Sequence, residues 1–238
     1  MAVYRVIISH LQSDSLVAFP SDENTVVVLD APTESDLDIC ARNGFRIRVM
    51  MSAGNRSSNR NAGFQRISDL YYPSDTDIVE FFDGDRYPVR YDPSVMDILR
   101  DGRADCLLYA CESDMRRVRY GIKGNPVSLV DTGTLCNPFY SCGFAMTVSA
   151  IRRVADYNGG NFFEPRFDRW GCEDQYLGLV CSVLGFRVAF TDRIVLHGDV
   201  GGDSFRHPDY RRALQTYVDL VRERDIPVRC EPTPSVAL

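Results

Sequence analysis

The chain has 238 residues, of which 45% are hydrophobic and 25% are charged, and its formal net charge is −6. This length and composition allow one substantial buried core and exclude a largely disordered chain. The negative net charge argues against a partner that is bound by neutralising many phosphates at once.

The first half of the chain alternates short apolar runs with helical patterns. Strands are expected over residues 4–9, 25–29, 45–50 and 77–82. Helices are expected over residues 33–43 and 57–72, with Thr33 as the first N-cap and Gly44 just past the first helix. Such alternation predicts right-handed crossovers and an α/β domain with a mostly parallel central sheet and helices on both faces.

The second half continues with fewer strand signals. We expect a strand over residues 104–111, a turn at Gly143 followed by a helix to residue 156, a helix over 173–184 and a strand over 186–190. A charged amphipathic helix is predicted over residues 208–224. Residues 226–238 contain three prolines and are expected to form a tail.

Two carboxylates follow the apolar fourth strand directly. Asp83 and Asp85 flank Gly84, at the carboxyl end of a strand, which is where sheets of this class bind ligands. Hard oxygen ligands on a sharp bend suit Mg²⁺ or Mn²⁺, which also take oxygens from a diphosphate. An acidic pair alone is a weak signal, because a solvated acidic turn is common, so the interpretation depends on its position.

Residues 52–63 join the third strand to the second helix and are rich in serine, asparagine, glycine and arginine. Backbone amides at a helix start attract anions, and Arg56 or Arg60 could add forked hydrogen bonds to phosphate. The segment matches neither a P-loop nor a dinucleotide-binding fingerprint, so a merely polar helix start remains an alternative.

A third group lies at residues 167–174, where Trp170, the only tryptophan, precedes Glu173 and Asp174. Acids in a first helical turn can simply complement the helix dipole. An aromatic wall beside a carboxylate is also what a sugar-binding base requires, because the ring stacks on the sugar and the acid removes a hydroxyl proton. His197 follows the apolar run 194–196, and a neutral imidazole is a suitable third ligand for Mn²⁺ beside two carboxylates.

The order of these motifs resembles that of the GT-A glycosyltransferases. It runs from D-x-D through a glycine-centred turn at residues 141–144 and W-G-C-E-D to a strand ending in histidine, roughly over residues 4–200. The later part is most similar to the β1,4-galactosyltransferase and polypeptide N-acetylgalactosaminyltransferase branches. The resemblance implies a GT-A-type catalytic domain over residues 1–225, with a donor part over 1–111 and an acceptor part over 112–225.

For the donor side, the resemblance implies a metal motif of Asp83 and Asp85, with Asp85 the direct ligand and His197 completing a site for Mn²⁺ or Mg²⁺. Further residues are expected along the nucleotide-sugar donor, and these are His10, Asp30, Arg56, Arg60 and Asn61.

For the acceptor side, the resemblance makes Asp174 the catalytic base, with Glu173 and Trp170 in the acceptor floor and Gly143 and Phe144 beside it. Cys172 and Gln175 depart from the pattern of the galactosyltransferase branch. Both acidic motifs must lie at one site for this assignment to hold.

The expected activity is transfer of a sugar from a nucleotide-diphosphate sugar, with UDP as the default, to an acceptor hydroxyl with inversion. The acceptor would be a glycan, a lipid-linked saccharide or a protein, with a modified nucleic-acid base as a remoter choice. One alternative is a sugar-phosphate nucleotidyltransferase, although residues 10–19 lack the glycines and basic residues of its loop. The other is an inactive nucleotide-sugar or carbohydrate-binding module, against which both acids of W-G-C-E-D argue.

The eight cysteines are scattered, with no C-x-x-C pair, and are expected to be buried reduced thiols. No apolar run reaches the length of a membrane span, and the first ten residues lack the features of a secretion signal. We therefore expect a cytoplasmic protein.

Overall fold

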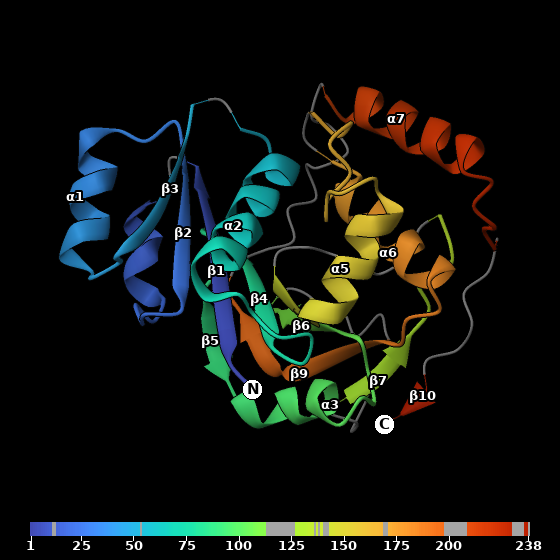
Figure 1. The fold of residues 1–238 in the computed structure, drawn as a ribbon, viewed down its shortest axis with the longest axis horizontal. Helices are drawn as coiled ribbons and strands as arrows, with labels where there is room; N and C mark the ends of the chain where they lie inside the picture. The colour runs from blue at the N-terminus through green and yellow to red at the C-terminus, as the bar shows by residue number, and fades with distance from the viewer. Residues whose placement is uncertain are drawn as a thin grey trace.

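A central sheet carries the fold, and its ten described strands lie in the order β10-β7-β9-β6-β8-β4-β1-β2-β3, with β5 paired to β9 (Figure 1). The computed structural model describes residues 1–10, 13–52, 54–112, 127–135, 137, 139, 143–168, 171–197, 209–229 and 236–237. Helices cover both faces of this sheet, which confirms the expected α/β class.

The N-terminal half of the sheet is parallel, as predicted. It contains β1 (Val3–His10), β2 (Thr25–Asp30), β3 (Ile47–Met51) and β4 (Ile78–Asp83). In the strand register, His10 lies opposite Asp30, and Ile8 lies opposite Asp83. The carboxyl ends of β1, β2 and β4 therefore meet at one edge, where ligands bind in sheets of this kind.

The two predicted helices of this half, α1 (Glu34–Arg42) and α2 (Arg56–Tyr71), begin within one residue of the expected positions. A short 3-10 helix, η1 (Ser13–Ala18), was not predicted and lies where a loop was expected. Thr33 caps α1 in a capping box with Asp36, and Asn55 caps α2 in the same way with Ser58. Gly63 lets α2 pack closely on β1, because a Cβ atom there would lie 2.3 Å from Cγ1 of Val6.

The C-terminal half of the sheet is mixed. Its strands are β5 (Pro88–Tyr91), β6 (Cys106–Cys111), β7 (Val127–Val130), β8 (Gly143–Thr147), β9 (Val188–Leu196) and β10 (Val236–Ala237). Strand β8 lies antiparallel between β4 and β6, whereas β6 and β9 are parallel. The expected turn at Gly143 is wrong, because this residue begins β8, and a Cβ atom there would lie 2.3 Å from Cδ1 of Leu196.

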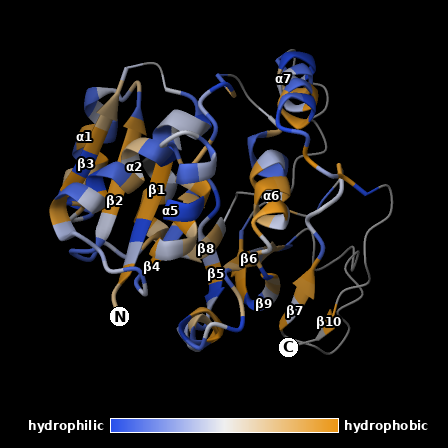
Figure 2. Ribbon diagram, turned by 45° about the vertical axis from the view of Figure 1, so that its right-hand side comes forward, coloured by the Kyte–Doolittle hydropathy of each residue, from blue (hydrophilic) through white to orange (hydrophobic). Residues whose placement is uncertain are grey.

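The two faces of the sheet bury separate apolar cores. The remaining helical elements are η2 (Pro93–Met96), α3 (Asp97–Arg100), α5 (Val148–Tyr157), α6 (Glu173–Val183) and α7 (Tyr210–Glu223). Buried side chains of α2, α5, α6 and α7 share one core, and those of η1, α1 and α3 share the other. Figure 2 shows β1 and β2 in hydrophobic colours and α7 in mostly hydrophilic ones, as a central sheet and an outer helix require.

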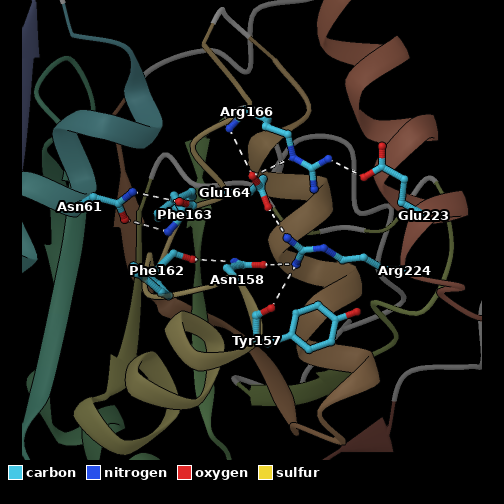
Figure 3. A network of polar contacts seen from close by, with 9 residues as sticks. All are labelled: Asn61, Tyr157, Asn158, Phe162, Phe163, Glu164, Arg166, Glu223 and Arg224. Atoms are coloured by element: carbon cyan, nitrogen blue, oxygen red, sulfur yellow. Dashed lines mark hydrogen bonds and ion pairs between the residues drawn. The ribbon is translucent and has the colours of Figure 1, made fainter.

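A polar network anchors the segment between α5 and α6 (Figure 3). The side-chain amide of Asn61, on α2, accepts from the N–H of Phe163 over 2.8 Å and donates to its carbonyl over 2.9 Å. Arg224, the residue directly after α7, donates to Oδ1 of Asn158 over 2.7 Å and to the buried carboxylate of Glu164 over 2.5 Å. The segment that leads to W-G-C-E-D is thus fastened on both sides.

The C-terminal residues belong partly to the sheet. Arg229 forms an isolated bridge with Thr134, and Val236–Ala237 pairs antiparallel with β7. This corrects the expectation of a simple tail over residues 226–238. Five cysteines fall within the described residues, at positions 40, 106, 111, 172 and 181, and all are buried. No helix of the described residues is long and apolar enough to cross a membrane.

Candidate active site at the carboxyl edge of the sheet

The D-x-D segment bends sharply where β4 ends. The N–H of Gly84 donates to the carbonyl of Ile8 over 2.6 Å, and a Cβ atom at Gly84 would lie 2.8 Å from that oxygen. Only glycine fits this close approach. The bend separates the two carboxylates, because Asp83 is buried while the side chain of Asp85 is 36% exposed.

Arg60 joins the two acidic motifs. Its Nη2 atom lies 2.7 Å from Oδ1 of Asp83, and its Nη1 atom lies 3.4 Å from Oε1 of Glu173. All three side chains are buried, so these charges attract each other in surroundings of low dielectric constant. The acids of D-x-D and of W-G-C-E-D therefore lie at one site, as the sequence analysis required, whereas Trp170 lies outside the described residues.

Arg56 occupies the more open side of the same acidic group. Its Nη1 atom lies 3.8 Å from Oδ2 of Asp83, and its side chain is 38% exposed. Desolvation opposes its ionisation, but the charges of Asp83, Glu173, Asp174 and Asp85 outweigh this effect and raise the pKa of Arg56. Unlike the enclosed Arg60, this guanidinium is placed where a bound anion can reach it.

The carboxyl group of Asp174 has an unusually high pKa. Desolvation by burial, and next the charge of Glu173, raise its pKa from 3.8 to about 7. The N–H of Gln175, which donates to Oδ1 over 2.8 Å, and the two arginines act in the opposite direction. The side chain remains partly exposed. A carboxylate that titrates near neutral pH is suited to act as a general base.

The loop between β3 and α2 forms the other wall. Oδ1 of Asp30 accepts from the N–H of Gly54 over 2.7 Å, so this aspartate holds the loop at the end of β2. The buried side-chain atoms that lack a hydrogen-bond partner within the described residues include three at this site, Oγ of Ser57, Oδ1 of Asn59 and Oε2 of Glu173. Unsatisfied polar atoms of this kind are unusual and are consistent with a site that a ligand completes.

His197 lies beside the D-x-D segment because β5 pairs with β9. Its backbone N–H donates to the carbonyl of Tyr87 over 2.8 Å. Its ring stacks on the ring of Tyr87, with 4.9 Å between the two ring centres. Its Nδ1 atom lies 2.9 Å from Oε2 of Glu112, a residue that the sequence analysis missed. A carboxylate at Nδ1 leaves Nε2 as the nitrogen that can bind a metal.

The donor atoms for a metal are only partly assembled. The described residues contain no group of three or more His, Cys, Asp or Glu side chains that could hold an ion together. Asp83 faces two arginines, whereas Asp85 and His197 remain the partly exposed oxygen and nitrogen donors. A carboxylate oxygen and an imidazole nitrogen are ligand types that Mn²⁺ takes, and the carboxylate also suits Mg²⁺.

Many solved structures share this architecture, and three of them are described below. Comparisons with known protein families and with curated proteins find no match. GalNAc-T7 with UDP, GalNAc and Mn²⁺ is 13% identical, with a TM-score of 0.59 over 93% of this chain and 48% of that one. Mycobacterium tuberculosis glucosyl-3-phosphoglycerate synthase with Mg²⁺ and UDP is 14% identical, with a TM-score of 0.55 over 95% and 80%. TarS 1-349 of S. aureus is 16% identical, with a TM-score of 0.54 over 93% and 66%. The chain has the GT-A fold.

At these identities the likeness concerns the GT-A fold alone, and the chain spans about half of the solved GalNAc-T7 chain and about two thirds of the TarS 1-349 chain. The fold explains why Asp83, Asp30 and the start of α6 converge at one edge. Other expected residues have different surroundings in this structure. The side-chain amide of Asn61 is hydrogen-bonded to the backbone of Phe163. The side chain of His10 lies outside the described part.

Phe144 requires a correction. Its ring is completely buried in the core and stacks on Phe81 at 4.9 Å. A buried ring offers no surface to an acceptor, so Phe144 is a core residue and is not assigned to acceptor contact. Gly143 is buried as well, packed against Leu196 and Tyr109.

Proposed function

We propose that the protein is a glycosyltransferase that moves a sugar from a nucleotide-diphosphate sugar to an acceptor hydroxyl. The observation that carries the proposal is the Arg60 bridge, which brings the D-x-D acid Asp83 and the W-G-C-E-D acid Glu173 to one edge of a GT-A fold. The structural neighbours support it, since they include a mannosyltransferase of Pyrobaculum calidifontis in complex with GDP-Man and Mn²⁺.

Asp174 would act as the general base. The acceptor hydroxyl gives its proton to this carboxylate while the hydroxyl oxygen forms a bond to the anomeric carbon of the donor sugar. On the opposite side, the bond from that carbon to the phosphate oxygen breaks, which inverts the configuration. A pKa of about 7 keeps a large fraction of Asp174 ionised at neutral pH while leaving it basic enough to accept the proton.

The leaving diphosphate carries negative charge that the site must stabilise. Arg56, with its partly exposed guanidinium, is the residue of this chain that we assign to the phosphates. Asp85 and Nε2 of His197 would hold a divalent cation, with Mn²⁺ as the first choice. When bound, that cation would act as a Lewis acid on the diphosphate.

The donor is proposed to be a UDP-sugar and the acceptor a glycan, a lipid-linked saccharide or a protein hydroxyl. A UDP-sugar is the default because two of the solved neighbours contain UDP. A modified nucleic-acid base was suggested by the arginine-rich stretches over residues 116–119 and 206–212. The first stretch lies outside the described part of the chain, and of the second only residues 209–212 are described, where Arg212 pairs with Asp168. That acceptor is not proposed.

A panel of UDP- and GDP-sugars tests this function. The purified protein is incubated with each donor and Mn²⁺, Mg²⁺ or EDTA, and release of nucleoside diphosphate is measured. We expect cation-dependent release from at least one donor and a loss of that release in Asp174→Asn. If no donor is bound or hydrolysed, the proposal is wrong. Pyrophosphate release from a nucleoside triphosphate and a sugar phosphate would instead identify a nucleotidyltransferase.

A further inference from the structure

Arg60 is the largest fully buried side chain of the described residues, with 1% of its surface exposed. An enclosed guanidinium is costly unless carboxylates pair with it. The resemblance to glycosyltransferases places Arg60 along the donor, but this degree of burial leaves almost no surface for a donor to touch. The role of Arg60 must therefore lie in what it holds inside the protein.

Among the described residues, Arg60 contacts at least three separate parts of the chain. Its two terminal nitrogens reach Asp83, at the end of β4, and Glu173, in the first turn of α6. The guanidinium also lies over the ring of Phe163, 4.9 Å from its centre. Phe163 is fixed in turn by Asn61, the next residue of α2. One turn of α2 thus touches both acidic motifs and the segment that leads into α6.

We propose that Arg60 is a positioning residue that fixes the first turn of α6, and with it Asp174, relative to the metal-motif end of β4. The inference rests on the proposed function and deepens it. It means that Arg60, which does not contact the substrates, aligns the base with the donor. A planar guanidinium holds two carboxylates with different nitrogens at once. A lysine ammonium is a single charged group, so it would keep the positive charge but could not reach both carboxylates with separate nitrogens.

Arg5 supplies a matched control. It is also a largely buried arginine, and its Nε atom lies 3.0 Å from Oε2 of Glu80, a completely buried carboxylate in the middle of β4. Its contacts lie with Tyr91 and Asp22, away from the acids of the proposed site. Arg5→Met therefore breaks a buried pair of the same kind on the same strand.

The test compares Arg60→Met, Arg60→Lys and Arg5→Met with the parent protein by hydrogen exchange. In both Arg60 variants, we expect faster exchange at residues 83–86 and 173–176, relative to the amides of β2. In Arg5→Met these two segments should exchange as they do in the parent. Arg60→Lys keeps the charge and serves as the informative variant if Arg60→Met does not fold. Equal exchange of the two segments in Arg60→Lys and Arg5→Met would overturn the proposal.

Kinetics with a donor from the panel provide the second readout. Since small misplacements of catalytic groups cost rate, we expect kcat of Arg60→Met to fall on the order of 100-fold, with the donor KM within about threefold of the parent. Arg5→Met should retain kcat. A kcat for Arg60→Met within threefold of that of Arg5→Met contradicts the proposal. If the parent protein binds no nucleotide sugar, the proposed function fails, and the exchange experiment still decides whether Arg60 links the two segments.

Discussion

The Nδ1 atom of His197 lies 2.9 Å from Oε2 of Glu112, just past the ends of two neighbouring parallel strands. The strands β6 and β9 pair up to Cys111 and Leu196, so the next residue of each strand arrives at the same edge of the sheet. Glu112 orients the imidazole and sets which ring nitrogen is available. The pair therefore prepares His197 for a ligand on its other side.

Replacing Glu112 by glutamine should weaken Mn²⁺ binding by about 10- to 100-fold, because partners of this kind orient a metal-binding histidine. The binding constant is measured by calorimetry in the presence of UDP. Asp105→Asn is the control, since it removes a partly exposed carboxylate just before the same strand begins. Unchanged affinity in Glu112→Gln would mean that His197 does not bind the metal.

Substitution of Asp83 should mainly lower the stability of the fold, whereas substitution of Asp85 should mainly lower the affinity for the metal. Asp83→Asn leaves the enclosed guanidinium of Arg60 with one carboxylate fewer, and we expect a cost of about 3 kcal/mol in the free energy of unfolding. Asp85→Asn removes a partly exposed group and should cost less than about 1 kcal/mol. Urea titrations measure both. The metal affinity should fall in Asp85→Asn, and equal stability of the two variants would contradict this division of roles.

Asp174→Asn should reduce turnover on the order of 10²- to 10⁴-fold while leaving the dissociation constant of the donor nearly unchanged, because the amide cannot accept the proton. Steady-state kinetics and calorimetric titration of the donor separate the two effects. Asp168→Asn, at a half-exposed carboxylate paired with Arg212, should keep the parent rate. Near-normal turnover of Asp174→Asn would remove this residue from the role of base.

Asp174 should also make the metal-free protein less stable as the pH rises. Its carboxyl ionises near pH 4 in the unfolded chain but only near pH 7 in the folded protein. The folded state therefore loses stability between these values, and the full loss is present above about pH 7. Asp174→Asn should gain roughly 2 to 3 kcal/mol more at pH 8 than at pH 5. Equal gains in urea titrations at both pH values would contradict the raised pKa.

Arg224 and Arg212, which both link α7 to its surroundings, should contribute unequally to the stability of the fold. Arg224→Met removes the closer partner of the buried carboxylate of Glu164 (Figure 3), and we expect a loss of about 3 kcal/mol. Arg212→Met breaks an ion pair whose side chains are 63% and 48% exposed, and this should change stability by less than about 0.5 kcal/mol. Thermal and urea unfolding provide the comparison, and similar losses in both variants would argue against an anchoring role for the network.

The N-terminal half of the fold was predictable because its signals are local. Thr33 and Gly44 mark the two ends of α1 within a few residues of sequence, and buried parallel strands are recognisable as apolar runs. The second half was less predictable, because β5, β7 and β10 depend on partners far along the chain. Nothing near Gly143 indicates that it starts a strand between β4 and β6.

The site was predictable to a similar extent. Asp83 and Asp85 could be found because the end of an apolar strand in an alternating pattern already places them at the edge of the sheet. The inward orientation of Arg60 could not be predicted, since it depends on two carboxylates contributed by other elements. Glu112 could have been found by noting that it directly follows a predicted strand. Its pairing with His197 required the register of β6 and β9.

The place of β8 in the sheet also affects how the protein is made. Strand β4 can pair with β1 as soon as both have left the ribosome, but its other neighbour, β8, is translated much later. Until then, the growing chain carries a strand with four apolar side chains and one open edge, which is a template for pairing with other chains. Nascent chains stalled between these two strands should therefore aggregate more readily than chains released after residue 147.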